Sequence, residues 1–310
     1  MGKIAFLFAG QGAQYSGMGK SLTEISPKAK ALFELVDSIR PETSQQCFEG
    51  DTAELTQTKN TQPCVFTVDL ASAYALEEAG VHADAAAGFS LGEMAALTFA
   101  GSFSENEGFS LVCRRGELMQ EAAEKYPSAM AAVLKLSDKA VEELCANFPD
   151  VYPVNYNCPG QLVVAGGRDH LDRFCELAAQ AGGRAKKLAV GGGFHSPFME
   201  EASAAFCKEL DRAGGVGMPR IPVYGNRTAA PYSEEREAML AEQMKNPVLW
   251  TKTIERMAAD GVDTFIEVGP GKTLSGLVKR ILPQAVVCRV EDAATLEETL
   301  RTLQETGGQE

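Results

Sequence analysis

The sequence predicts an α/β protein in which a large domain with a parallel sheet core carries a smaller, inserted domain. Segments typical of strands alternate with segments typical of helices along most of the 310 residues, as in sheets with crossover helices. The run Gly88-Phe89-Ser90-Leu91-Gly92 joins a short apolar strand to a helical pattern. Between about 126 and 191 the order is strand-helix-strand-strand-helix-strand, which is typical of a ferredoxin-like unit.

The first part of the large domain, residues 1–125, opens with an apolar strand at 3–9. This run is short and leads into Gly10-Gln11-Gly12, which fits a buried strand better than a signal sequence. A second strand is expected at 83–88, directly before Ser90. Apolar residues at helical spacing predict helices at 28–39, 64–79, 91–99 and about 105–124.

The inserted small domain is expected to span 126–191. Ser137 is suited to cap a helix, and Cys158-Pro159-Gly160 to turn the chain between two strands. Gly191-Gly192-Gly193 is the expected hinge back to the large domain. The predicted strands are 130–136, 151–157, 161–165 and 184–190, and the predicted helices are 137–147 and 169–181.

The second part of the large domain, residues 192–310, resumes with a helix that begins at Ser196-Pro197. Serine is a preferred helix cap, and proline is favoured in the first helical position. This helix is expected to end near Arg212, and Thr306 to Glu310 are expected to fray. Further strands are predicted at 221–225, 263–268 and 285–290, and further helices at 234–244, 250–259, 273–281 and 293–305.

The composition narrows the class of protein and of partner. Hydrophobic residues make up 45% and charged residues 23%, which is ordinary for a soluble globular protein. The net charge of −13, from 29 basic and 42 acidic residues, argues against a nucleic-acid partner, because phosphate binding requires a basic face. No apolar run approaches the length of a membrane span. We therefore expect a cytoplasmic monomer without a membrane partner.

The cysteines and histidines predict neither disulfides nor a metal site. Eight cysteines are scattered along the chain without a Cys-x-x-Cys pair, so reduced, mostly buried thiols are expected. Only three histidines are present, too few to favour a zinc site.

Ser90 is the candidate nucleophile, because Gly-x-Ser-x-Gly between a strand and a helix is the sequence of a nucleophile elbow. A serine hydroxyl requires a base to take its proton. Of the three histidines, His82 and His170 lie in segments expected at the surface. His195 lies between the triple glycine and a helix cap, where a loop presents it at a domain boundary, and is the preferred base. No acidic partner for it is obvious, and a backbone carbonyl is an alternative.

An oxyanion hole needs two donors near the attacked carbonyl. The N–H of Leu91, directly after the nucleophile, supplies one, and the loop Gly10-Gln11-Gly12-Ala13-Gln14 is placed to supply another. Two phosphate-binding alternatives fail. The same loop lacks the third glycine of the dinucleotide fingerprint, and Gly269-Pro270-Gly271-Lys272-Thr273 lacks the first glycine of a P-loop.

Arg114 and Arg115 interrupt a helix that is otherwise apolar on one face. Arg114 is expected to be solvated. A buried arginine aimed at the site would instead bind a carboxylate through two parallel hydrogen bonds.

The chain resembles the malonyl-CoA:acyl carrier protein transacylase family over nearly its whole length. No single motif carries this resemblance; their combination and order do. The matching segments are Gly10-Gln11-Gly12-Ala13-Gln14, Gly88-Phe89-Ser90-Leu91-Gly92-Glu93, Arg115-Gly116-x-x-Met119-Gln120, Asn155-x-Asn157-x-Pro159-Gly160-Gln161, Phe194-His195, Asn246-Pro247-Val248-x-Trp250 and Glu267-Val268-Gly269-Pro270-Gly271.

The resemblance implies a hydrolase-like α/β large domain with a ferredoxin-like insertion, and it assigns the reacting groups. Ser90 would be the nucleophile and His195 its base. The backbone amides of Gln11 and Leu91 would form the oxyanion hole. The main-chain carbonyl of Gln243 would orient His195, which accounts for the missing acid.

The resemblance also implies a substrate with a free carboxylate, which would pair with Arg115. One position departs from the commonest family pattern, because Phe89 stands where many members have histidine. Phe194, before the base, resembles the malonyl-selective pattern of related polyketide acyltransferases. The remaining positions expected near the site are Met119, Asn155, Asn157 and Phe194.

The function implied is transfer of a malonyl group from malonyl-CoA to the phosphopantetheine thiol of acyl carrier protein, through a malonyl-serine intermediate, in fatty acid biosynthesis. The implied partners are acyl carrier protein and a coenzyme A thioester, with no permanently bound cofactor. Two alternatives are a stand-alone acyltransferase of a polyketide synthase and a serine acyl hydrolase.

Overall fold

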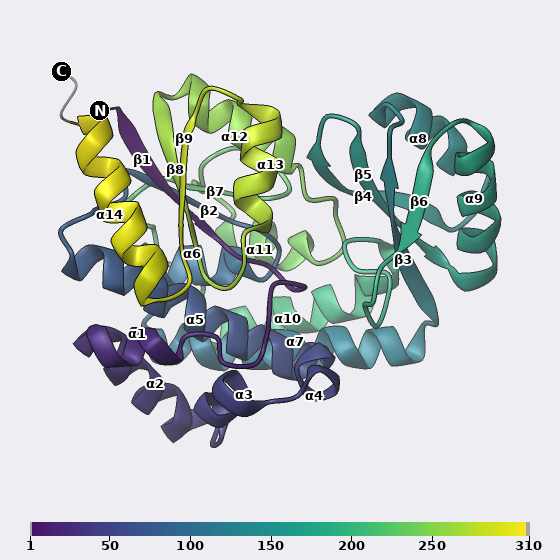
Figure 1. Ribbon diagram of the computed structural model, residues 1–310. Coiled ribbons are helices and arrows are strands. Elements are labelled where there is room, and N and C mark those ends of the chain that lie inside the picture. The colour runs from purple at the N-terminus through teal and green to yellow at the C-terminus, as the bar shows by residue number, and fades with distance from the viewer. Residues whose placement is uncertain (1, 308–310) are drawn as a thin grey trace.

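The computed structural model describes residues 2–307 and contains two separate sheets (Figure 1). The larger sheet is wholly parallel, with strand order β7-β2-β1-β8-β9. The smaller sheet is antiparallel, with order β4-β5-β3-β6. The α/β class with a parallel core and a separate antiparallel sheet is confirmed. The strands are β1 (Lys3–Phe8), β2 (Ala85–Gly88), β3 (Ser128–Leu134), β4 (Val151–Cys158), β5 (Gln161–Gly167), β6 (Arg184–Lys187), β7 (Val223–Tyr224), β8 (Val262–Val268) and β9 (Val286–Val290).

Helices cover the parallel sheet, while α8 and α9 cover one face of the antiparallel sheet (Figure 1). The long helix α7 extends from the parallel sheet towards the antiparallel one, and its end leads into β3. The helices are α1 (Lys20–Ile25), α2 (Pro27–Ile39), α3 (Thr43–Glu49), α4 (Thr52–Thr56), α5 (Thr58–Glu78), α6 (Gly92–Phe99), α7 (Glu105–Lys125), α8 (Asp138–Cys145), α9 (Arg168–Gln180), the 3-10 turn η1 (Pro197–Met199), α10 (Glu200–Arg212), α11 (Arg236–Gln243), α12 (Trp250–Ala259), α13 (Thr273–Ile281) and α14 (Ala293–Gly307).

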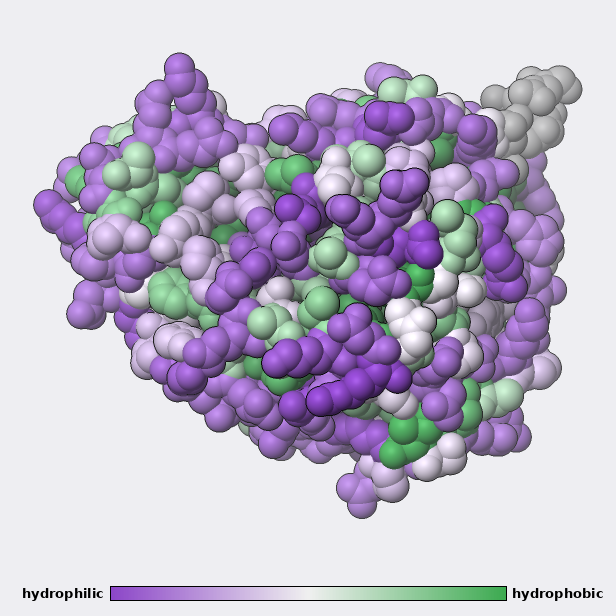
Figure 2. Space-filling view, turned by 180° about the vertical axis from the view of Figure 1, so that it is seen from behind, coloured by the Kyte–Doolittle hydropathy of each residue, from purple (hydrophilic) through white to green (hydrophobic). Residues whose placement is uncertain are grey.

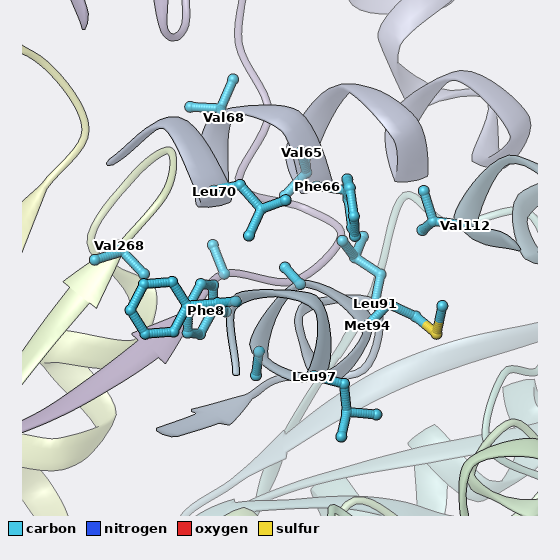
Figure 3. Close-up of a cluster of buried hydrophobic side chains, with 14 of the residues drawn as sticks. Phe8, Val65, Phe66, Val68, Leu70, Leu91, Met94, Leu97, Val112 and Val268 are labelled. Atoms are coloured by element: carbon cyan, nitrogen blue, oxygen red, sulfur yellow. The ribbon is translucent and has the colours of Figure 1, made fainter. Parts of the chain in front are cut away.

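The main core lies between β1 and the helices α5, α6 and α7 (Figure 3). Phe8, Phe66 and Leu91 are fully buried in this layer. Leu91 directly follows Ser90, so the packing of its side chain fixes the start of α6 and with it the position of the serine. A buried leucine contributes about 1.5–3 kcal/mol relative to an exposed one.

Several element boundaries differ from those expected. Helix α5 begins at Thr58 rather than at 64 and contains Pro63 in its second turn, where the proline cannot donate the hydrogen bond to the Lys59 oxygen that another residue would make. Strand β7 is only Val223–Tyr224, since it is an edge strand that pairs on one side with β2. The short helices α1, α3 and α4 were not expected at all, because so few residues show no clear period.

At the C-terminal end, helix α14 continues to Gly307, and the expected fraying of 308–310 lies outside the described residues. The face in Figure 2 is mainly hydrophilic, with hydrophobic residues in small groups. Within residues 2–307, no helix has the length and apolar character that crossing a bilayer demands.

Candidate active site

Ser90 lies on a tight turn between β2 and α6, at a strained backbone position. Its φ is 56°, in the left-handed region that few residues other than glycine adopt. A Cβ on Gly88 would lie 1.9 Å from the carbonyl carbon of Gly92, and one on Gly92 would lie 2.3 Å from the Phe8 oxygen. Both glycines are therefore required for the turn that exposes the Ser90 hydroxyl.

His195 meets this hydroxyl from the loop before η1. Its Nε2 lies 2.7 Å from Ser90 Oγ, and its Nδ1 lies 2.9 Å from the main-chain oxygen of Gln243. Because a carbonyl only accepts, Nδ1 carries the proton and Nε2 presents a lone pair to the serine. Burial, with a smaller contribution from the Arg115 charge, lowers the pKa of His195 to about 4. The imidazole is thus neutral at pH 7 and able to accept a proton.

His195 is also strained, with a φ of 61°. Its own N–H donates to the Met244 oxygen at 3.0 Å, so the segment after α11 holds both its backbone and its ring. Ser90 and His195, which contact one another, thus each occupy a left-handed backbone position, and each is held by surrounding hydrogen bonds.

The two amides expected in the oxyanion hole belong to loops that follow neighbouring strands, β1 and β2. Among residues 2–307, neither the Gln11 nor the Leu91 main-chain N–H has an acceptor within the protein. The loops pack tightly, since a Cβ on Gly10 would lie 2.7 Å from the Phe89 oxygen. Unpaired amides beside a nucleophile are available to a developing negative charge.

Arg115 comes from α7 and is fully buried. Its Nη1 donates to Gln62 Oε1 at 2.8 Å and its Nη2 to Gln243 Oε1 at 2.8 Å. The same Nη2 lies 3.5 Å from Ser90 Oγ. Burial lowers the pKa of Arg115 to about 10, so the guanidinium still carries a positive charge at neutral pH. A cation is therefore buried directly beside the nucleophile.

Arg114, the residue before Arg115, lies at the surface instead. It is partly exposed and forms ion pairs with Glu117, Glu121 and Glu209 at the surface. The two neighbouring arginines therefore differ in environment as the sequence predicts.

A buried polar network behind the elbow was missed at the level of sequence. Glu93 accepts hydrogen bonds from the Asn226 N–H at 2.9 Å, from Gln243 Nε2 at 3.1 Å and from the Tyr232 hydroxyl. Asn226 Oδ1 in turn accepts from the Ser90 N–H at 2.7 Å. Burial raises the pKa of Glu93 to about 7. The only signal in the sequence was an acidic residue directly after the second glycine of the elbow.

The other expected residues lie around the same centre. Phe194 and Met119 are buried, and Met119 Sδ accepts from Gln62 Nε2 at 3.2 Å. Asn155 and Asn157, from β4, line a cavity of about 200 Å³ that Gln11 and Phe89 also line. The Oδ1 atoms of both asparagines are buried and have no partner within residues 2–307.

Two histidines, Phe89 and the start of α13 have no polar role at this centre. His82 and His170 are exposed, and His170 Nδ1 lies 2.6 Å from Asp150. Phe89 packs edge-on against Trp250 with ring centroids 5.3 Å apart, an apolar contact where a histidine would have been polar. The start of α13 is occupied by the Glu267 carboxylate, which accepts from two of its amides, so it does not hold a phosphate.

Residues 5–304 match the acyl transferase domain family. A malonyl CoA-acyl carrier protein transacylase of Bacillus subtilis (strain 168) is 40% identical over 313 residues, covering 98% of this chain and 98% of that protein.

Two solved structures have nearly the same fold. The malonyl CoA-acyl carrier protein transacylase of Clostridium perfringens ATCC 13124 matches with a TM-score of 0.94 and 37% identity, over 98% of each chain. A malonyl-transacylase solved in complex with a type II PKS acyl-carrier protein matches with a TM-score of 0.92 and 32% identity, over 97% of this chain and 99% of that one.

Proposed function

The chain belongs to the malonyl-CoA:acyl carrier protein transacylases, and from this membership we propose that Ser90 carries a malonyl group between its two substrates. The malonyl group passes from malonyl-CoA to the phosphopantetheine thiol of acyl carrier protein, in fatty acid biosynthesis. Both substrates are thioesters or thiols, so one serine and one base serve both halves of the reaction. The observation that carries the assignment of residues is the 2.7 Å contact between Ser90 Oγ and His195 Nε2.

In the first half, Ser90 Oγ attacks the thioester carbonyl carbon while His195 Nε2 takes the hydroxyl proton. The amides of Gln11 and Leu91 stabilise the oxyanion of the tetrahedral intermediate. The carbon–sulfur bond then breaks, and the coenzyme A sulfur leaves with the proton from His195. The product is a malonyl-serine ester.

In the second half the carrier's thiol gives its proton to His195 and attacks the ester carbonyl. The bond to Ser90 Oγ breaks, and the serine recovers the proton from His195. Arg115 binds the free carboxylate of the malonyl group in both halves, with Met119 and Phe194 as apolar neighbours in the buried site.

We also propose that the active site lies where two domains meet, 1–125 with 192–310 and the inserted 126–191. Two contacts support this division. Val248, from the large domain, exchanges main-chain hydrogen bonds with Val154 and Tyr156 of β4, at 2.8 and 2.9 Å. Arg280 of α13 donates to Gln161 Oε1 and to the Pro159 oxygen, at 2.6 and 3.0 Å.

A cytoplasmic location is part of the proposal, supported by eight cysteines that are all unpaired.

Mass spectrometry of the intact protein tests the proposal. Incubation with malonyl-CoA is expected to add one malonyl group, on the peptide that contains Ser90, and later addition of phosphopantetheinylated carrier protein is expected to remove it. The Ser90→Ala variant is expected to take up none. Free malonate in place of malonyl-carrier would indicate a hydrolase, and a label on another residue would refute Ser90 as the nucleophile.

A further inference from the structure

The contacts of Arg115 are unusual for a buried cation, because its direct partners are neutral. A fully buried arginine normally pairs with a carboxylate. Here the partners are the amide oxygens of Gln62 and Gln243, each 2.8 Å from one Nη atom. Within residues 2–307, no Asp or Glu forms an ion pair with Arg115. Its Nε has no partner in the same part of the chain.

The orientation of the Gln243 amide is dictated by its neighbours. Its Nε2 donates to the Ser90 oxygen at 2.8 Å and to Glu93 Oε2 at 3.1 Å. A carbonyl and an ionised carboxylate only accept, whereas a guanidinium only donates. The amide therefore satisfies all three groups in one orientation alone, with its oxygen towards Arg115.

Gln62 is oriented in a similar way from the other side. Its Nε2 lies 3.2 Å from Met119 Sδ, a weak acceptor, and its oxygen faces Arg115. Gln62 is 1% exposed, so water does not compete for these contacts. The two glutamines thus hold the guanidinium at both Nη atoms.

Glu93, when it is ionised, supplies a negative charge without touching Arg115. It lies on the far side of the Gln243 amide, and its charge favours the cationic form of Arg115. A charge at this distance offsets part of the cost of burying the cation. It leaves the remaining N–H groups of the guanidinium without an anionic partner.

We infer that Gln62 and Gln243 are positioning residues that determine specificity. They form a neutral pair that fixes Arg115 in place and leaves the guanidinium free to pair with the carboxylate of the substrate. A carboxylate at either position would make the same hydrogen bond but would compete with the malonyl carboxylate for the guanidinium. This inference rests on the proposed role of Arg115.

The test is one isosteric change, Gln62→Glu, with acylation of the protein by malonyl-CoA and acetyl-CoA as the readout. The expected result is a fall in the ratio of kcat/KM for malonyl to that for acetyl of about tenfold or more, equal to about 1.4 kcal/mol, expressed mainly as a higher KM for malonyl-CoA. Gln180→Glu, the same change at an exposed position on α9, is expected to leave the ratio unchanged.

Gln62→Met separates charge from hydrogen bonding, because methionine is neutral and of similar length but does not accept well from Arg115. If neutrality matters, the ratio falls more in Gln62→Glu than in Gln62→Met. A ratio in Gln62→Glu within threefold of the wild-type value, or a larger fall in Gln62→Met, would overturn the inference. Thermal unfolding of each variant shows whether it is folded.

Arg115→Ala distinguishes failure of this inference from failure of the proposed function. If Arg115→Ala leaves the ratio unchanged, then Arg115 does not select the carboxylate and the proposed role is wrong. If Arg115→Ala lowers the ratio but Gln62→Glu does not, only the inference about the neutral pair is wrong.

Discussion

The two sides of the active site differ in how completely their polar groups are paired. On the side of the parallel sheet, Ser90, Glu93, Asn226 and Gln243 exchange hydrogen bonds with one another, while the Gln11 and Leu91 amides remain available. On the side of the antiparallel sheet, Asn155 and Asn157 present buried Oδ1 atoms with no partner within residues 2–307. The paired network around Ser90 is preorganised for the reaction, whereas the side of Asn155 and Asn157 has acceptors left for whatever enters the cavity.

The largest effect on the acylation rate is expected from removing His195, the proposed base. His195→Ala should slow acylation by malonyl-CoA at least about 10⁴-fold, because within residues 2–307 the other side chain that contacts Ser90 Oγ is Arg115, which only donates. Rapid-quench measurement of the acyl-enzyme checks this. A loss of less than tenfold would mean that another group serves as the base.

Removing the cation is expected to have the next largest effect. Arg115→Ala should reduce the preference for malonyl over acetyl by about 100-fold, or about 2.7 kcal/mol, because the carboxylate then enters a buried site without a partner. Competition between the two thioesters in one reaction measures the ratio directly. Arg114→Ala, at the neighbouring surface position, is the matched control and should not change it.

Two asparagine substitutions, one on each side of the site, compare what each side contributes to the free energy of unfolding. Asn226→Ala leaves the Ser90 N–H and the Gly88 oxygen without partners, and should lower the free energy of unfolding by about 2 kcal/mol or more. Asn157→Ala removes an acceptor that has no partner within residues 2–307, and should cost less than about 1 kcal/mol. Urea unfolding measures both. Equal losses would remove the distinction between the two sides.

The smallest effect concerns pH. Burial lowers the pKa of His195 to about 4, so the acylation rate should stay nearly constant from pH 8 to pH 5 and fall only below that range, as Nε2 takes up a proton. Stopped-flow measurement of acylation across this range checks the profile. A fall centred near pH 6.5, the ordinary histidine value, would mean that the ring is solvated.

The titrations of His195 and Glu93 change the free energy of unfolding in opposite directions. The unfolded chain protonates His195 near pH 6.5, before the folded protein does, so the stability contributed by the neutral ring is lost as pH falls from there towards 4. Burial raises the pKa of Glu93 to about 7. The stability that Glu93 contributes when protonated is therefore lost as pH rises through 7. Comparing the pH dependence of Tm in the wild type and in Glu93→Gln isolates the second contribution.

Sequence periodicity was sufficient for the long elements and the two sheets, because amphipathic patterns over many residues determine which face is buried. It failed for α1, α3 and α4, each of seven residues or fewer. Their positions depend on tertiary contacts more than on any local pattern.

The reacting groups could be named from local motifs and family resemblance, but the network around them could not. Gln62 lies 53 residues from Arg115 and Gln243 lies 128 residues from it. A glutamine has no distinctive signature in a sequence, and its role here arises only when α5, α7 and α11 meet. The carbonyl partner of His195 belongs to the backbone, which no side-chain pattern records.

The carbonyl oxygen that holds His195 bears on the lifetime of the acyl-enzyme. A carbonyl stabilises the imidazolium less than a carboxylate would, and burial together with the Arg115 charge lowers the pKa of His195 and makes the ring a weak base. A thiol, with an ordinary pKa of about 8.5, is much easier for such a base to activate than water, whose pKa is far higher. In the proposed mechanism, a neutral and weakly basic His195 is therefore expected to discharge the malonyl-serine ester to a thiol much faster than to water.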